Sequence, residues 1–178
     1  GFFTILLNQA GVETIGVDGA EKMLQEARAK ALQAGLVPEF RRMDCHRLDF
    51  ADNTFDAVIS RNLTHTLRDH KQVYKEWLRI LKPGGTLLIF DANWHLTECD
   101  EKLRAESLKR REECIRLYGD AFDKKSDHKD TEEHERTVGG HVLGNKRRPD
   151  WDMGLLEGIG YKKISCERSI IEEMWDEK

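Results

Sequence analysis

Polar residues of types that bind nucleosides stand at four places where an apolar segment of the chain ends. These places are Asp18, Asp44, the run Ser60-Arg61-Asn62 and the run 91–95. A carboxylate such as that of Asp18 can accept two hydrogen bonds from the hydroxyl groups of a ribose. The carboxylate of Asp44 can accept a hydrogen bond from the amino group of an adenine. These residue types therefore favour a ligand that contains a nucleoside.

Each of these residues also has an explanation that involves no ligand. Asp18 precedes a helix that is predicted to begin near Ala20, so its side chain could cap that helix. Asp44 could form an Asx turn with its neighbours. Met23 could lie against a purine ring through its polarizable thioether, or it could simply pack in the core. Taken singly, the residues leave both interpretations open.

Alternating helices and strands through residue 90 would position these residues. Helices are predicted where apolar residues recur with helical spacing, and strands where short apolar runs end in polar residues. The helices are expected at 2–10, at 20–34 and after the cap Asp69, and the strands at 14–17, 38–42, 55–60 and 86–90. This order predicts βαβ units in a mostly parallel sheet, with ligands bound beyond the carboxyl ends of its strands.

A strongly charged segment interrupts this pattern. We expect residues 97–148 to be a helical insertion that acts as a substrate-covering lid or lies as a solvated surface helix. The stretch 123–136 has almost no apolar residues and is predicted to be disordered or a loop when nothing is bound. After the insertion we expect a short helix around 151–156 and a last strand at 161–166.

Neither metal sites nor strong anion sites are predicted. The pair of Asp91 and His95 lacks a recognised metal-ligand pattern, and so do the acidic and histidine residues of 128–134. The basic cluster 146–148 is interpreted either as a contact for an anionic substrate group or as a solvated loop.

Composition limits the class of protein. The 178 residues are 39% hydrophobic and 35% charged, which suits one globular domain, and the formal net charge is −4. This acidic balance argues against nucleic acid and anionic lipid as partners. Four scattered cysteines and the lack of a long apolar run predict a soluble, cytoplasmic protein with no membrane partner.

Four strings of sequence are together more specific than the single residues. They are GFFTILLNQAGVETIGVDGAEKML, RRMDCHRLDF, FDAVISRNLTHTL and EWLRILKPGGTLLIFD. In this order they resemble the class I, Rossmann-like S-adenosylmethionine-dependent methyltransferases, most closely the small-molecule branch that includes the ubiquinone and menaquinone biosynthesis enzymes. The resemblance is close over residues 1–91 and loose over 149–167. It implies an α/β fold in which a doubly wound, mostly parallel sheet carries helices on both faces, in a single domain over 1–178.

The resemblance also implies roles for single residues. Asp18 matches the acid that binds the ribose, and Asp44 matches the acid that meets the adenine amino group. His65 matches a position where a histidine often stands close to the substrate. The other implied cofactor contacts are Gly1 as the last glycine of a glycine-rich loop, Gly19 and Met23 beside the adenine, Cys45 through its backbone, and Arg61 and Asn62 facing the methionine moiety.

Two parts of the family's sheet are not evident in this sequence. The first strand and the first loop glycines would precede Gly1, and the last strand is not evident after Cys166 unless 169–174 supplies it. Loss of the first strand, which lies in the middle of the family's sheet, would leave two strand edges unpaired. We therefore expect the functional protein to be longer than the sequence shown.

The resemblance implies methyl transfer from S-adenosylmethionine to a small-molecule acceptor (EC 2.1.1.-), with S-adenosylhomocysteine as product. Such an in-line displacement depends mainly on the positioning of the two reactants. A general base helps where the acceptor must lose a proton, and the candidates are His65 and His95. Asn93 and Trp94 are candidates for the acceptor pocket. Two alternatives stay open at this point: an NAD-dependent oxidoreductase, because Asp18 would serve an NAD ribose equally well, and a noncatalytic nucleoside-binding domain.

Overall fold

The computed structural model describes residues 1–92, 100–119, 143 and 146–167. The chain divides into two compact units. Unit 1 comprises Gly1–Arg61 and Asp69–Phe90, and unit 2 comprises Asn62–Arg68 and the described residues from Asp91 onward. Within the described residues, no helix is both long enough and apolar enough to span a membrane.

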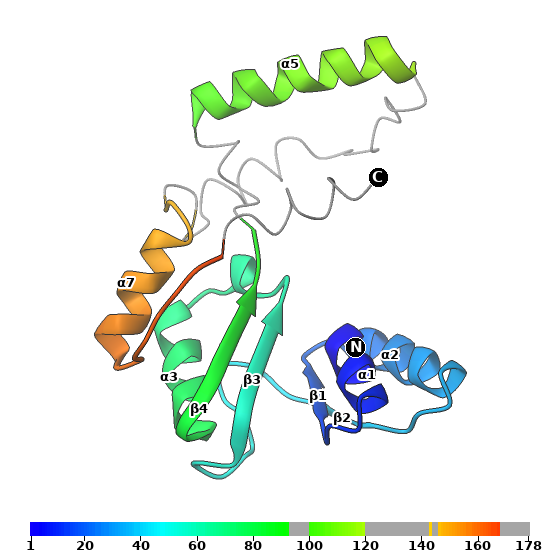
Figure 1. Ribbon diagram of the computed structural model, residues 1–178, viewed down its shortest axis with the longest axis vertical. Coiled ribbons are helices and arrows are strands. Elements are labelled where there is room, and N and C mark those ends of the chain that lie inside the picture. Colours follow the sequence, from blue (N-terminus) through cyan, green and yellow to red (C-terminus); the bar gives the residue numbers. More distant parts are fainter. Residues whose placement is uncertain (93–99, 120–142, 144–145, 168–178) are drawn as a thin grey trace. The chain divides into compact units, whose positions relative to one another are not determined.

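Helices and strands alternate in the first half of unit 1 (Figure 1): α1 (Phe2–Gln9), β1 (Ile15–Asp18), α2 (Glu21–Gln33) and β2 (Glu39–Arg42). The two strands pair in parallel, with Asp18 opposite Arg42 at their carboxyl ends. One face of α2 carries apolar residues at helical spacing, and these pack on the ring of Phe40 to form a small core: Leu24, Ala27 and Ala31.

Gly16 allows β1 and β2 to approach each other closely. A Cβ atom on Gly16 would lie only 2.4 Å from a ring carbon of Phe40 and 3.0 Å from Oγ1 of Thr4. Any side chain at this position would collide with a buried ring, so the glycine is required by packing.

A second parallel pair forms the other half of unit 1, from β3 (Phe55–Arg61) and β4 (Leu81–Phe90), with α3 (His70–Ile80) between them in the chain. Asp69 caps α3 as predicted, because its carboxylate accepts a hydrogen bond of 2.9 Å from the backbone N–H of Gln72. The buried face of α3 repeats every three to four residues: Val73, Tyr74, Trp77 and Ile80.

β4 begins five residues before the predicted start at residue 86. Leu81 pairs with Phe55 and Thr86 pairs with Ala57, so residues 82–85 form an irregularity within the ladder. Gly84 has a φ of 82°, and a Cβ on Gly85 would lie 2.9 Å from the carbonyl oxygen of Lys82. The two glycines therefore let the chain turn inside the strand instead of ending the pairing.

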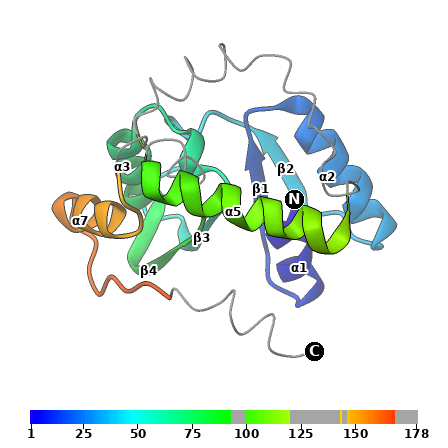
Figure 2. The same ribbon diagram turned by 90° about the horizontal axis from the view of Figure 1, so that it is seen from above.

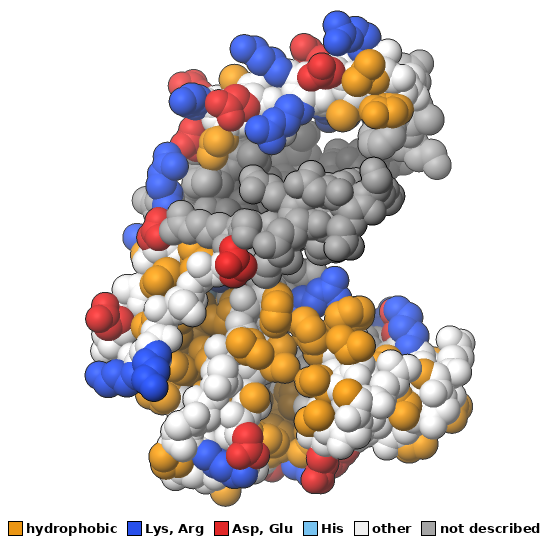
Figure 3. Space-filling model, in the orientation of Figure 1, with side chains coloured by type: hydrophobic (Ala, Val, Ile, Leu, Met, Phe, Trp, Pro, Cys, Tyr) orange, Lys and Arg blue, Asp and Glu red, His pale blue; other side chains and the backbone are white. Residues whose placement is uncertain are grey.

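The two parallel pairs are separate two-stranded sheets, β1–β2 and β3–β4 (Figures 1 and 2). Both the α/β class and the parallel pairing agree with the sequence-based expectation. Apolar side chains gather over α1 and the β3–β4 pair in the space-filling view (Figure 3). The exposed apolar side chains on these elements include Phe2, Leu6, Leu88 and Phe90.

Unit 2 contains the short 3-10 helix η1 (Thr64–Thr66) and the helices α5 (Glu101–Tyr118) and α7 (Asp150–Ile159). α5 is one continuous helix within the expected charged insertion (Figure 2), and Asp100 caps it by accepting from the N–H groups of Lys102 and Leu103. α7 contains the short helix predicted at 151–156.

The strand predicted at 161–166 is wrong. The structure gives this segment no strand pairing, and Lys163 has a φ of 54°, which interrupts an extended backbone. The predicted disorder of 123–136 and the possible strand at 169–174 fall outside the described residues.

Candidate functional site

Three predicted cofactor-binding residues lie where strands of unit 1 end or have just ended. Asp18 is the last residue of β1, Arg61 is the last residue of β3, and Asp44 follows β2 after one intervening residue. Because parallel strands direct their carboxyl ends to one edge of a sheet, each pair presents its candidate residues at the edge where α/β proteins bind ligands.

The Asp18 carboxylate closes the turn between β1 and α2. Its Oδ1 accepts a hydrogen bond of 2.8 Å from the N–H of Ala20, and its backbone carbonyl accepts one of 3.2 Å from the N–H of Met43. Ala20 is the residue that precedes α2, which has no side-chain cap. Among the described residues, Oδ2 of Asp18 has no hydrogen-bond partner. The carboxylate is therefore held in place by one oxygen and presents the other.

A cavity of about 370 Å³ brings together three of the predicted cofactor residues, Gly1, Met23 and Arg61. The guanidinium of Arg61 lies over the ring of Phe2, 4.6 Å from the ring centre. A Cβ on Gly1 would lie 2.6 Å from the Cβ of Ala27, so the start of α1 lies directly against α2. The other lining residues come from α1 and α2: Phe2, Ile5, Leu6, Gln9, Glu26, Ala27 and Lys30.

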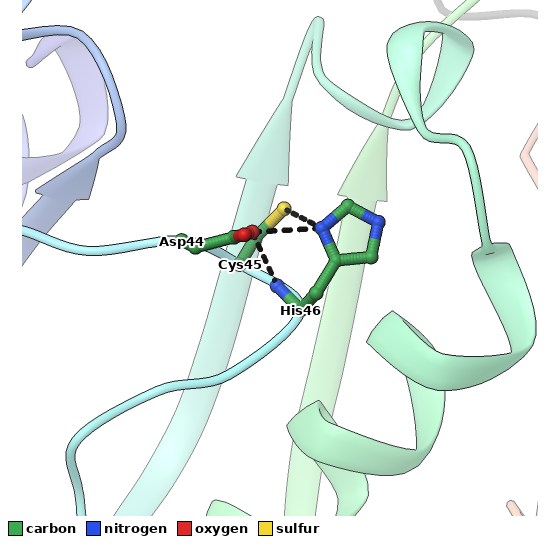
Figure 4. Close-up of side chains that lie close together, drawn as sticks. All are labelled: Asp44, Cys45 and His46. Carbon is green, nitrogen blue, oxygen red and sulfur yellow. Dashed lines mark hydrogen bonds and ion pairs between the residues drawn. The ribbon is translucent and has the colours of Figure 1, made fainter.

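Asp44, Cys45 and His46 form a compact turn (Figure 4). Oδ1 of Asp44 accepts from the N–H of His46 at 2.9 Å and lies 2.7 Å from Nδ1 of the same ring, while Sγ of Cys45 lies 3.7 Å from that nitrogen. The carbonyl of His46 accepts from Nε2 of Gln72 at 3.1 Å, which ties the turn to α3. The hydrogen bond from the N–H of His46 to Oδ1 of Asp44 is the Asx turn that the sequence analysis considered.

Asp44, Cys45 and His46 are also a potential set of metal ligands, because one ligand atom of each lies within 4.8 Å of the others. The sequence analysis did not identify this set. Burial, followed by the negative charge of Asp44, raises the pKa of the Cys45 thiol. A thiol with a raised pKa stays protonated at neutral pH and is a poor ligand and nucleophile. We interpret the cluster as a hydrogen-bonded turn.

Unit 2 contains a buried carboxylate, that of Asp91, whose partners the sequence analysis did not identify. Asp91, whose side chain is 2% exposed, accepts from Oγ1 of Thr64 at 2.6 Å and from the N–H of Ala92 at 2.8 Å. It also accepts from the backbone N–H of His65 at 3.2 Å and lies 2.9 Å from Nδ1 of the His65 ring. The structure thus gives the predicted catalytic residue His65 an acidic partner 26 positions away.

The protonation of this pair follows from its contacts. Burial raises the pKa of Asp91, but hydrogen bonds from Thr64, Ala92 and His65 and the positive charge of Arg148 outweigh it, so the pKa lies below its ordinary value. Asp91 is therefore ionised at neutral pH, and because an ionised carboxylate can only accept, Nδ1 of His65 donates to it. Nε2 is then the basic nitrogen of the ring, which is the arrangement that orients a histidine general base.

Arg148 differs from both sequence-based interpretations of the basic cluster. Its side chain is 7% exposed, donates to Asp152 and to Oγ1 of Thr64, and lies 3.8 Å from Oδ2 of Asp91. Arg147, by contrast, is 72% exposed and pairs with Asp100 at 2.7 Å. Arg148 is thus neither solvated nor directed to an external anion.

The remaining predicted site residues divide into two that are described, Gly19 and Asn62, and three that are not. The backbone carbonyl of Gly19, between β1 and α2, accepts from Nε of Arg42 at 3.2 Å. Asn62 follows β3 directly and has a φ of 50°, a left-handed conformation that turns the chain away from the strand. Asn93, Trp94 and His95, the predicted acceptor pocket and second candidate base, lie outside the described residues.

Comparison with known proteins identifies the family. A family model described as a methyltransferase domain matches residues 1–89, half of the chain. The chain therefore belongs to the methyltransferase domain family.

Two curated relatives and one solved structure show how far the likeness extends. The chain is 38% identical over 80 residues to phosphatidylethanolamine N-methyltransferase of Cereibacter sphaeroides. These 80 residues are 44% of this chain and 39% of the relative. It is 37% identical over 81 residues to demethylmenaquinone methyltransferase of Thermus thermophilus, covering 46% and 37%. A Pyrococcus horikoshii structure superposes with a TM-score of 0.52 at 36% identity, covering 55% of this chain and 48% of that one. The chain thus spans less than half the length of each.

Proposed function

We propose that the protein transfers a methyl group from S-adenosylmethionine to a small-molecule acceptor and releases S-adenosylhomocysteine. The observation that carries the proposal is the family match over 1–89, which contains Asp18 at the end of β1 and Arg61 at the end of β3. In this proposal Asp18 binds the ribose hydroxyls. The other cofactor contacts are Gly19 and Met23 beside the adenine, Asp44 and Cys45 at its amino edge, and Gly1, Arg61 and Asn62 toward the methionine moiety.

A small-molecule acceptor is supported by the relatives. The names phosphatidylethanolamine N-methyltransferase and demethylmenaquinone methyltransferase both specify a small molecule as the methylated compound. The formal charge of −4 gives no general attraction to nucleic acid. A place in the quinone-biosynthesis branch is the finer form of the proposal and is supported by the second of these relatives.

His65 is the proposed general base, and Asp91 the residue that orients it. Methyl transfer is an in-line displacement in which positioning supplies most of the rate enhancement. Where the acceptor must lose a proton, Nε2 of His65 accepts it, and the ionised Asp91 stabilises the imidazolium that results. A base of this kind contributes roughly 10²- to 10⁴-fold to the rate.

The fold proposed for the whole protein is a single doubly wound domain in which one further strand joins β1–β2 to β3–β4. Two observations support it: the two pairs are separate sheets, and apolar side chains of α1 and β4 are exposed. The charged segment 97–148 is proposed to cover the acceptor during the reaction.

The test is a calorimetric titration of S-adenosylhomocysteine into the protein expressed from its full reading frame. Asp18→Ala removes hydrogen bonds to a charged group, so we expect binding roughly 10- to 100-fold weaker. Glu13→Ala, an exposed acid five residues away, is the matched control and should bind like the wild type. Binding of NADH in place of S-adenosylhomocysteine would overturn the proposal, and binding without turnover on any acceptor would favour a noncatalytic domain.

A further inference from the structure

We propose that Arg148 is a positioning residue for methyl transfer: it fixes Thr64 and Asp91 so that Asp91 holds the His65 ring. The inference rests on the proposed function, because it concerns the base of that reaction. The residues involved are called here the Asp91 network: Thr64, His65, Asp91, Arg148 and Asp152.

The hydrogen bonds that join Arg148 to His65 run in one direction. A guanidinium has donors and no acceptor, so Oγ1 of Thr64 must accept from Arg148. The Thr64 hydroxyl therefore directs its own proton to Oδ2 of Asp91, 2.6 Å away. Oδ1 of Asp91 is then the oxygen that meets Nδ1 of His65 at 2.9 Å. Arg148 thus sets the direction of a chain of hydrogen bonds that ends at the base.

The charged side chains of the Asp91 network are buried. The side chains of Asp91, Arg148 and Asp152 are 2%, 7% and 8% exposed. Charges in such an environment are weakly screened, so each one acts strongly on its neighbours. The guanidinium is held at both ends, by Asp152 through Nε and by Thr64 through Nη2, and it therefore cannot turn away from Asp91 without breaking buried contacts.

The charge balance of the Asp91 network affects the protonation of His65. With a neutral His65 ring, the five described residues of the network hold two carboxylates and one guanidinium, a net charge of −1. A proton taken up by His65 brings this sum to zero, which favours the protonated base that forms during the reaction. The positive charge of Arg148 opposes that proton, so Arg148 limits this preference.

Arg148 comes from a part of the chain that lies outside the family match. Thr64 and His65 lie within the 1–89 segment that matches the family, whereas Arg148 lies 84 residues beyond Thr64, just before α7. The last residue of the charged segment 97–148 thus supplies a determinant of the base that the family match does not contain.

The charged groups that bear on His65 within the described part of unit 2 are Asp91 directly, and Arg148 and Asp152 behind it. The neighbouring pair of Arg147 and Asp100 is set apart from these groups, because Asp100 caps α5 and the Arg147 side chain is mostly exposed. Arg147→Met is therefore a matched control for Arg148→Met.

The experiment is a nuclear magnetic resonance titration of the full-length protein with labelled histidines and bound S-adenosylhomocysteine, with His65 assigned through His65→Gln. We expect the wild-type ring to carry its proton on Nδ1. Arg148→Met removes a nearby positive charge, so the titration midpoint of His65 should rise by about one pH unit relative to wild type. Asp152→Asn removes a negative charge from the network and should lower that midpoint, and Arg147→Met should leave it unchanged.

A double variant tests the proposal in case the single variant Arg148→Met does not fold. Arg148→Met with Asp152→Asn removes both members of a buried ion pair and is expected to fold. It leaves the network charge as in the wild type, so its His65 midpoint should lie below that of Arg148→Met. A midpoint that is the same in wild type, Arg148→Met and the double variant would overturn the proposal, as would a wild-type proton on Nε2. Because these readings need no methyl acceptor, a failure of methyl transfer itself would appear separately, as absent turnover with His65 titrating as expected.

Discussion

Replacement of His65 by glutamine removes the imidazole but keeps a polar side chain of similar length. For an acceptor that must lose a proton, we expect kcat to fall roughly 10²- to 10⁴-fold, because no group then accepts that proton. The affinity for S-adenosylhomocysteine should not change, and calorimetric titration of the same sample provides that control. An unchanged kcat over the whole pH range would remove His65 from the mechanism.

Asp91 is expected to make the free energy of unfolding fall at low pH. Its folded-state pKa lies below its ordinary value of about 3.9, so its stabilising effect is complete at neutral pH and is lost as the pH falls through the folded-state pKa. In Asp91→Asn, the free energy of unfolding should therefore depend less on pH below about 4. Urea unfolding at several pH values measures this, with the exposed Asp49→Asn as control. Equal slopes in both variants would contradict the expectation.

At the residue scale, sequence reasoning located the acids that follow strands but could not find their partners. Asp18 and Asp44 stand where predicted because each follows a short strand that the local pattern already indicates. The pairing of His65 with Asp91 joins two segments 26 residues apart, and no local pattern records it. Arg147 and Arg148 are the same residue type side by side, yet one is exposed and the other buried, and only tertiary contacts distinguish them.

At the scale of elements, a single arginine of α3 holds the connection that leads into β3. Arg79 donates to the carbonyls of Leu48 and Phe50 at 3.0 Å and 2.7 Å and pairs with Glu76 and Asp52. We expect Arg79→Met to lower the free energy of unfolding by about 2–3 kcal/mol, because buried carbonyls and a half-buried acid lose their donor. Lys82→Ala, which breaks the exposed pair with Asp56, should cost less than about 1 kcal/mol.

Urea unfolding curves of both variants give the two free energies directly. An Arg79→Met protein as stable as Lys82→Ala would show that the contacts of Arg79 are not needed to hold the loop.

Helices and strands with a strong periodic pattern were predictable, and those governed by single backbone angles were not. The repeat of apolar residues fixes α2 and α3 within one or two residues of expectation. The early start of β4 depends on two glycines that keep residues 82–85 inside the ladder, although a Lys-Pro-Gly-Gly run usually indicates a turn. The missing strand at 161–166 depends on one positive φ at Lys163.

At the scale of the whole molecule, the described parts of the two units differ in how many apolar side chains they bury. Most of the described buried apolar side chains, including the cluster around α2 and the inner face of α3, belong to unit 1. Those of unit 2 are Leu67, Leu143 and Leu156. The sequence analysis expected unpaired strand edges, and the two pairs of strands in unit 1 are separate sheets.

This difference predicts that unit 2 loses its structure first. In hydrogen exchange followed by mass spectrometry at rising urea concentration, peptides from α7 should lose protection at a lower concentration than peptides from α2 and α3. The reason is that burial of apolar surface supplies most of the stabilising free energy. Loss of protection at one common concentration would mean that the two units unfold as one.

The contact between Thr64 and Arg148 closes a loop of 84 residues by side chains alone. The entropy lost on closing a flexible loop grows only with the logarithm of its length, so doubling the length adds about 0.6 kcal/mol. Homologous chains could therefore gain or lose residues between the end of α5 and Arg148 at little energetic cost, provided that the arginine still returns to the threonine. The length of this segment can then evolve with the size of the acceptor while the geometry of the base stays the same.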